Sequence, residues 1–277
     1  MWRQGFRQAA KGLFEMLGMR MQLVNIVRMV VDDPSAGHVP ESWVYGPVHS
    51  RRFGNSLGIS FSRAGQWACG WRCPYCQLGH LPKPVEAEPA VFAEVPELLA
   101  ELDHALSTAT ALDVITIAGS GEPTDHPRCA ELFAAIVERA HRSGTRVTLL
   151  TNGDGLGHSC QVADLDGMTV FVKWDPGPRQ GAWRRLAAED RFARFATLPA
   201  LQVQTLVFDG PGGGNSSDDL RRRWQDDIRR LAPRAVQVTT IERPPPSARL
   251  RPLSAEALQA WAAAAAAALE LPVRVFV

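Results

Sequence analysis

A repeated order of elements runs through this chain from Tyr45 onward: a short strand rich in β-branched residues, then a turn, then a helical stretch. Strands that alternate with helices at this spacing favour parallel strands joined by right-handed crossovers. Six such units predict an α/β fold, a partial (β/α)6 barrel of parallel strands, with a last short strand at its edge. The predicted strands are 57–61, 113–118, 146–150, 169–174, 201–208, 235–241 and 272–277, and the predicted helices are 90–106, 129–143, 182–197, 217–231 and 255–269.

The first 40 residues do not follow this order and predict a separate helical extension. Residues 2–17 place apolar side chains at helical spacing, with a second stripe of charged residues at intervals of four. A second apolar segment, 21–31, ends at Asp32-Asp33-Pro34. The chain therefore divides into an N-terminal helical extension, 1–40, and a barrel domain, 41–277. We expect the extension to pack on the barrel domain, and a membrane-surface anchor or a docking element for a partner is the alternative interpretation.

The charges of the chain do not indicate a nucleic-acid or membrane partner. Thirty Lys and Arg against 29 Asp and Glu leave a net charge of +1, whereas RNA binders generally present a basic surface. No stretch holds the roughly 18 to 20 apolar residues that span a bilayer, because Arg20, Asn25 and Arg28 interrupt the N-terminal apolar run. Five cysteines, three of them within eight residues, do not form the pattern of a disulfide framework. A reducing, cytoplasmic location is the expectation.

Three of these cysteines form a metal-binding pattern in a loop after the first predicted strand. Cys69, Cys73 and Cys76 stand at i, i+4 and i+7, and three soft ligands on one short loop suit an iron-sulfur cluster or zinc. A structural zinc site needs four ligands, and here the fourth would be His80, His49 or a distant residue. A [4Fe-4S] cluster held by three cysteines instead leaves one iron open to a substrate or cofactor. The spacing favours the cluster.

Two more motifs lie where predicted strands end. Gly119-Ser120-Gly121-Glu122 follows the second strand and Thr151-Asn152 follows the third, and parallel α/β folds assemble their sites at that end of the strands. With the C-x3-C-x2-C loop and its aromatic Tyr75 before the last cysteine, these motifs resemble the radical S-adenosylmethionine (SAM) superfamily. The segments 45–52, 55–58, 77–79, 119–124, 215–220 and 241–246 resemble, more narrowly, the branch of that superfamily related to wyosine-tRNA synthesis.

The resemblance implies a cofactor set and a reaction. Cys69, Cys73 and Cys76 would hold three irons of a [4Fe-4S] cluster, and SAM would bind the fourth iron. Gly119, Ser120, Gly121 and Glu122 would receive the methionine amino group, Thr151 and Asn152 would contact SAM, and Tyr75 would lie beside adenine. A reducing partner such as flavodoxin or ferredoxin would supply the electron that cleaves SAM. The resulting 5'-deoxyadenosyl radical would take a hydrogen atom from the substrate.

Lys173 and Asp175 are predicted as a charged pair at the carboxyl end of the strand 169–174. Residues two apart share one face of a strand, so both side chains are expected inside the barrel. The resemblance implies that such a pair holds the SAM carboxylate and ribose, and we predict both as catalytic residues. The alternative is structural, with Asp175 capping the turn at Pro176-Gly177 and Lys173 as its ion-pair partner.

Arg51 and Arg52 lie before the cysteine loop and are a second candidate for binding. Guanidinium forks match carboxylate and phosphate groups, so the pair is a candidate for an anionic substrate group. An exposed, solvated pair is the other interpretation.

Three functions remain open from the sequence. The first is a radical SAM enzyme that abstracts hydrogen from a small molecule or peptide. The second is a wyosine-type tRNA-modifying enzyme, which the near-neutral charge disfavours. The third is an iron-sulfur electron-transfer protein without SAM cleavage, which would not need the motif that ends in Glu122 or the motif at Thr151-Asn152.

Overall fold

The computed structural model of the chain describes residues 42–62, 68–80, 92–177, 188–211 and 214–277. The predicted helical extension, 1–40, lies outside these ranges. Among the helices of the described ranges, none combines the length and the apolar character that crossing a membrane requires.

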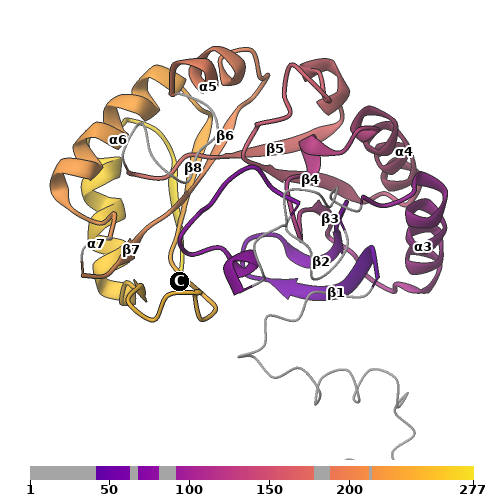
Figure 1. Cartoon of the computed structure of the whole chain (residues 1–277), viewed down its shortest axis with the longest axis horizontal. Coiled ribbons are helices and arrows are strands. Elements are labelled where there is room, and N and C mark those ends of the chain that lie inside the picture. The colour runs from indigo at the N-terminus through magenta and orange to yellow at the C-terminus, as the bar shows by residue number, and fades with distance from the viewer. Residues whose placement is uncertain (1–41, 63–67, 81–91, 178–187, 212–213) are drawn as a thin grey trace, which may run out of the picture. The chain divides into compact units, whose positions relative to one another are not determined.

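One curled, eight-stranded sheet forms the frame of the molecule, in the order β1-β2-β3-β4-β5-β6-β8-β10 (Figure 1). All neighbouring strands pair in parallel except β1, which pairs antiparallel with β2. The predicted partial barrel of parallel strands is therefore confirmed, with β10 at the predicted edge. The strands are β1 (Val44–Ser50), β2 (Gly54–Ile59), β3 (Val114–Ile117), β4 (Arg146–Thr151), β5 (Met168–Lys173), β6 (Gln202–Leu206), β8 (Ala235–Thr239) and β10 (Val273–Phe276).

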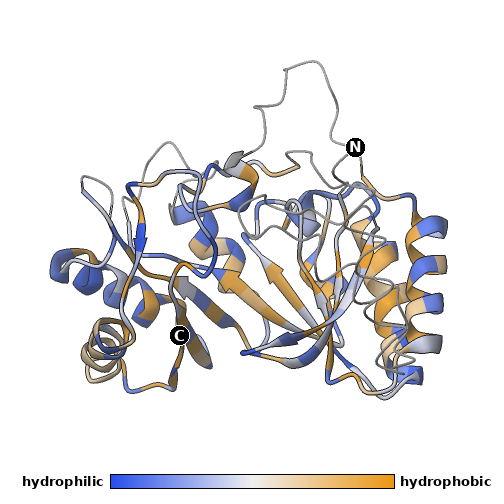
Figure 2. Ribbon diagram, turned by 90° about the horizontal axis from the view of Figure 1, so that it is seen from below, coloured by the Kyte–Doolittle hydropathy of each residue, from blue (hydrophilic) through white to orange (hydrophobic). Residues whose placement is uncertain are grey.

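Helices cover the convex face of the sheet, with apolar sides inward and polar sides outward (Figure 2). In α4, Leu132, Phe133, Ile136 and Ala140 recur at helical spacing and are all buried. Burying each large apolar side chain of this kind contributes about 1.5 to 3 kcal/mol. The helices are α3 (Val95–Thr108), α4 (Cys129–Arg142), α5 (Ala188–Phe195), α6 (Asp218–Leu231) and α7 (Ala255–Ala266).

The two faces of the sheet differ in polarity. Alternate strand residues such as Leu57, Ile117 and Val203 lie in the core beneath the helices and are almost fully buried. Because successive side chains in a strand point to opposite faces, the residues between them line the concave face. That face is rich in polar side chains: Ser56, Ser60, Thr116, Thr148, Asn152, Lys173, Gln204, Gln237 and Thr239. A polar inner face suits a site that binds a polar ligand.

Two strands differ from the sequence prediction. Strand β1 is absent from the sequence prediction; it contains Gly46 and Pro47, which an edge strand tolerates. The predicted strand 201–208 divides into β6 and the short β7 (Phe208–Asp209), which pairs with β9 (Arg251–Pro252) away from the main sheet. The described part of the predicted helix 182–197 is helical from Ala188 onward.

The turn between β1 and β2 contacts strands from other parts of the curled sheet. Phe53 in this turn contacts Phe171 on the concave face of β5, with ring centroids 5.4 Å apart. Arg51 forms an ion pair with Glu242, just beyond the end of β8. Since β1 lies at one end of the strand order, while β5 and β8 lie farther along it, these contacts cross the concave side of the half-barrel.

Candidate cluster and cofactor site

The three cysteines of the loop lie together after β2, in a segment held to the end of β3. Ala68 forms a β-bridge with Gly121, and a tight turn follows in which the Cys76 N–H donates to the Cys73 carbonyl at 3.0 Å. The Trp71 N–H donates to Cys69 Sγ at 3.4 Å. All three cysteines are partly buried and none forms a disulfide.

The donor set of this loop fits an iron-sulfur cluster. Burial raises the pKa of the Cys73 thiol to about 12, and it raises the pKa of Cys69 and Cys76 as well. Thiolates at such buried positions need a nearby cation, and a metal-bound thiol is deprotonated. Across the described ranges, no three His, Cys, Asp or Glu side chains surround a single metal ion. In a [4Fe-4S] cluster each cysteine binds a different iron, so the three thiols need not converge on one point.

Glu122, at the end of β3, lies against this loop and is almost fully buried. Its carboxylate accepts hydrogen bonds from Thr124 N at 3.0 Å, Thr124 Oγ1 at 2.7 Å, Asn152 N at 2.7 Å and Thr151 Oγ1. Burial raises the pKa of Glu122 to about 7, although these hydrogen bonds act in the opposite direction. Through its hydrogen bonds with Thr151 and Asn152, Glu122 holds the end of β4 against the end of β3.

Two glycines let the backbone after β3 pass close to its neighbours. Gly119 has φ +129°, and a Cβ there would lie 2.7 Å from the Cβ of Ser60. A Cβ on Gly121 would lie 2.4 Å from the Ala68 carbonyl oxygen. Any larger residue at either position would push the end of β3 away from the cysteine loop. The Ser120 carbonyl accepts from the Ser62 hydroxyl, which holds the same turn in place.

Asn152 joins the end of β4 to the cysteine loop. Its Nδ2 donates to Cys69 Sγ at 3.4 Å, while its backbone N–H donates to Glu122. The neighbouring Thr151 hydroxyl donates to the same carboxylate. The structure thus brings together the predicted residues of three segments: the cysteine loop, the end of β3 and the end of β4.

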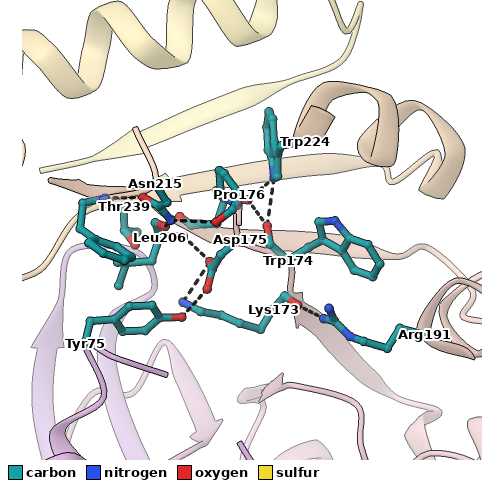
Figure 3. Close-up of polar contacts among 12 residues, drawn as sticks. Tyr75, Lys173, Trp174, Asp175, Pro176, Arg191, Leu206, Asn215, Trp224 and Thr239 are labelled. Carbon is teal, nitrogen blue, oxygen red and sulfur yellow. Dashed lines mark hydrogen bonds and ion pairs between the residues drawn. The ribbon is translucent and has the colours of Figure 1, made fainter. Parts of the chain in front are cut away.

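Lys173 and Asp175 share one face at the end of β5, as strand periodicity predicts. Lys173 Nζ lies 3.6 Å from Asp175 Oδ1 and 5.0 Å from the centre of the Tyr75 ring. Asp175 also accepts from the Tyr75 hydroxyl and, at 2.7 Å, from the Leu206 N–H (Figure 3). The carboxylate of Asp175 therefore does more than cap a turn: it connects β5, β6 and the cysteine loop.

The pKa of Tyr75 is raised well above its usual value, first by burial and then by the charge of Asp175. Its ring also packs edge-on against Phe208, with centroids 5.6 Å apart. The phenol of Tyr75 is therefore fixed as a neutral hydrogen-bond donor. This arrangement places the aromatic residue of the cysteine loop directly over the charged pair of β5.

Arg191 on α5 is a residue near the site that the sequence did not indicate. It is 1% exposed, and its guanidinium carbon lies 4.5 Å from the ring centre of Trp71 and 4.2 Å from that of Trp174. Its Nη2 donates to the Lys173 carbonyl (Figure 3). Arg191 thus attaches α5 to the cysteine loop and to β5, and a single arginine in a helical segment carries no sequence signal of such a position.

A pocket of about 200 Å³ opens beside Tyr75. Its walls come from the β1–β2 turn, the cysteine loop and the carboxyl ends of β6 and β8. The lining residues are Arg52, Tyr75, Gln77, Gln204, Leu206, Thr239, Thr240, Ile241, Glu242 and Arg243. Tyr75 therefore lines this pocket and also contacts the Lys173–Asp175 pair.

Comparison with known sequences gives a family. The profile of the Radical SAM superfamily matches residues 68–161, which contain the cysteine loop, Glu122 and Asn152. The UPF0026 protein slr1464 of Synechocystis sp. is 36% identical over 216 residues, covering 73% of this chain and 77% of that protein. A UPF0026 protein of Helicobacter pylori (strain J99) is 40% identical over 111 residues, covering 40% of this chain but only 34% of the length of that relative.

Comparison with solved structures supports the fold. Streptococcus suis SuiB bound to its precursor peptide SuiA aligns over 79% of this chain and 48% of SuiB, with a TM-score of 0.55 and 12% identity. SuiB bound to S-adenosylmethionine aligns over 79% of this chain and 49% of SuiB, with a TM-score of 0.54 and 11% identity. The chain thus spans about half the length of SuiB, and at this identity the likeness concerns the fold alone.

Proposed function

This chain belongs to the UPF0026 family, and we propose that it is a radical SAM enzyme that abstracts hydrogen from a small-molecule or peptide substrate. The observation that supports this most is the meeting of Cys69, Glu122 and Asn152 at the carboxyl ends of parallel strands. The three segments are far apart in the sequence, and a cluster-bound SAM would need all three.

In this proposal, each motif has one task. Cys69, Cys73 and Cys76 hold three irons of a [4Fe-4S] cluster, and Gly119 and Gly121 let the end of β3, which receives the methionine amino group, pack closely against Ser60 and Ala68. When bound, the cluster and SAM together supply a 5'-deoxyadenosyl radical. Glu122 and Asn152 orient the methionine end by hydrogen bonds, with Thr151 holding the Glu122 carboxylate in position.

The charged pair of β5 would contact SAM at other groups than the methionine amino group. Lys173 offers an ammonium group to the SAM carboxylate or ribose, and Asp175 keeps that ammonium in place. Tyr75, fixed by Asp175, covers the pair and excludes water from it. The protein thus supplies orientation and a dry site, while the cofactors carry the chemistry.

The pocket beside Tyr75 is the proposed substrate site. A volume of about 200 Å³ suits a small molecule or one side chain of a peptide. SuiB, which shares this fold, was crystallised with a precursor peptide. A peptide substrate is therefore one of the two kinds we propose.

The wyosine-type tRNA reaction stays a prediction of the sequence resemblance. Its test is retention of RNA by the purified protein on a salt gradient, because phosphate contacts make binding salt-dependent. Electron transfer without SAM cleavage is separated from the main proposal by an assay for 5'-deoxyadenosine. A flavodoxin or ferredoxin serves as the proposed reductant in that assay.

The test of the proposed function is the iron content of anaerobically reconstituted protein. We expect about four irons and four sulfides per chain, and almost none after Cys69, Cys73 and Cys76 are all changed to Ala. Cys129→Ala is the matched control, since Cys129 is a buried core residue whose thiol donates to the Ser159 carbonyl. Zinc without iron in the wild-type protein, or equal iron in the triple variant, would refute the cluster assignment.

A further inference from the structure

The fold gives the two adjacent arginines of the β1–β2 turn different environments. Arg51 is at the surface and forms an ion pair with Glu242. Arg52 instead lines the pocket beside Tyr75. The Nη1 atom of Arg52 is buried without a hydrogen-bond partner. Among the described residues the Arg52 guanidinium has no ion pair, and its carbon lies 5.0 Å from the centre of the Phe53 ring.

An unpaired guanidinium in such a position is costly. Burial, and to a smaller extent the nearby charge of Arg51, lower the pKa of Arg52 to about 10. Buried charges in folded proteins are normally paired, because removing a charge from water without a partner is unfavourable. Arg52 is thus a cation that lacks an anion within the described part of the chain.

The walls of the pocket do not supply that anion. Glu242 is the only acidic residue among the described lining residues, and it is paired with Arg51. The other walls offer the uncharged amide of Gln204 and hydroxyl of Thr239, which can hydrogen-bond a polar ligand, and a second cation, Arg243. The positive charge of Arg52 is therefore available to a ligand.

We propose that the substrate carries a carboxylate that binds Arg52 in this pocket. The inference rests on the proposed function, because the pocket adjoins the cofactor site through Tyr75. A carboxylate matches the planar fork of one guanidinium with two parallel hydrogen bonds and balances its single charge. The pocket of about 200 Å³ fits a small organic acid or the end of an acidic peptide side chain. The carboxylate is the shared chemistry of both.

Ligand-observed NMR on the full chain, reconstituted with oxidised cluster and SAM, tests this proposal. The probes are succinate and its neutral analogue succinamide, with the blocked peptides Ala-Glu-Ala and Ala-Gln-Ala as a second pair. We expect the acid of at least one pair to bind about tenfold or more tightly than its amide, as for a charge-assisted hydrogen bond. The pair that shows this difference identifies the source of the carboxylate.

Arg52→Gln is the test variant and Arg51→Gln its matched control. The Arg52 change should weaken binding of the acid about tenfold or more, with no effect on binding of the amide. The Arg51 change should weaken binding of the acid much less, because it frees Glu242 at the pocket wall but keeps the Arg52 fork, and Arg52→Lys should recover part of the affinity because it keeps charge but not the fork. Equal effects of the two glutamine variants, equal binding of acid and amide, or no binding of either acid would overturn the proposal.

Iron content and 5'-deoxyadenosine formation are measured on the same preparations. If both are normal while the acids fail to bind, the substrate proposal is wrong and the proposed function stands. If the wild-type protein holds no cluster, the proposed function fails whatever the acids do. Melting temperatures of the two glutamine variants within the wild-type range show that lost binding does not come from unfolding.

Discussion

Substitution of Lys173 tests whether this residue binds SAM or only pairs with Asp175. If it binds SAM, Lys173→Met should weaken SAM binding about tenfold or more. The fold should change less, because Asp175 keeps its hydrogen bonds from Tyr75 and Leu206. The measurement compares the SAM dissociation constant and 5'-deoxyadenosine yield with the melting temperature. A sharp fall in melting temperature with wild-type SAM binding would make Lys173 only the ion-pair partner of Asp175.

Single residues of the site differ in how far the sequence predicts them. The cysteine spacing and the two-residue period of Lys173 and Asp175 are local patterns, so both can be read from the chain. Arg51 and Arg52 are adjacent and chemically equal, and only the fold decides which one meets Glu242 and which one enters the pocket. Arg191 was missed for the same reason, since its aromatic neighbours are distant in sequence.

The carboxylate of Glu122 joins the ends of β3 and β4. Because this carboxylate is buried, the stability of the fold depends on pH. Its pKa is raised from 4.5 to about 7 in the folded chain, so the folded state holds the proton over that window. Stability should therefore fall as pH rises from about 4.5 to about 7, by an amount on the order of 3 kcal/mol at most.

Glu122→Gln resembles the protonated form and does not ionise. Its melting temperature, compared with the wild type, should improve steadily across the same pH window, while its SAM affinity should fall. Glu131→Gln is the control, because Glu131 is half-exposed and paired with Arg128 on the surface of α4. Parallel melting curves for the wild type and Glu122→Gln would contradict the assigned burial of the charge.

Strands and helices were easier to predict than their exact limits. Apolar, β-branched residues are frequent in segments such as β3 and β8, so the existence of these strands follows from composition. The break between β6 and β7 depends on the Asn215 side chain, which accepts from the Phe208 N–H at 2.8 Å and donates to the Leu206 carbonyl at 2.8 Å. A contact made by a side chain seven residues away leaves no periodic signal.

The β1–β2 turn lies across the concave side of the half-barrel. No local sequence pattern predicts this position. The β1–β2 hairpin joins the sheet at one end, and its turn contacts β5 and the segment after β8. The same turn carries Arg52, so closure of the barrel and construction of the proposed substrate pocket depend on the same three residues, 51–53.

The closing contacts are unequal in strength, and this can be measured. The Phe53–Phe171 pair lies inside the barrel, and an aromatic pair contributes about 0.5 to 1.5 kcal/mol beyond its buried area. The Arg51–Glu242 pair is exposed, with side chains 44% and 52% accessible, and such pairs contribute about 0 to 1 kcal/mol. Phe53→Ala should therefore lower the melting temperature by roughly 4 to 8 °C.

Arg51→Gln should change the melting temperature by less than about 4 °C. A measurement at high salt further distinguishes the contributions of the two contacts, because salt screens the exposed ion pair and leaves the aromatic pair intact. The effect of Phe53→Ala should thus persist at high salt, while any effect of Arg51→Gln should shrink. If Arg51→Gln destabilises the protein more than Phe53→Ala does, the Arg51–Glu242 ion pair holds the turn in place, and the aromatic contact inside the barrel does not.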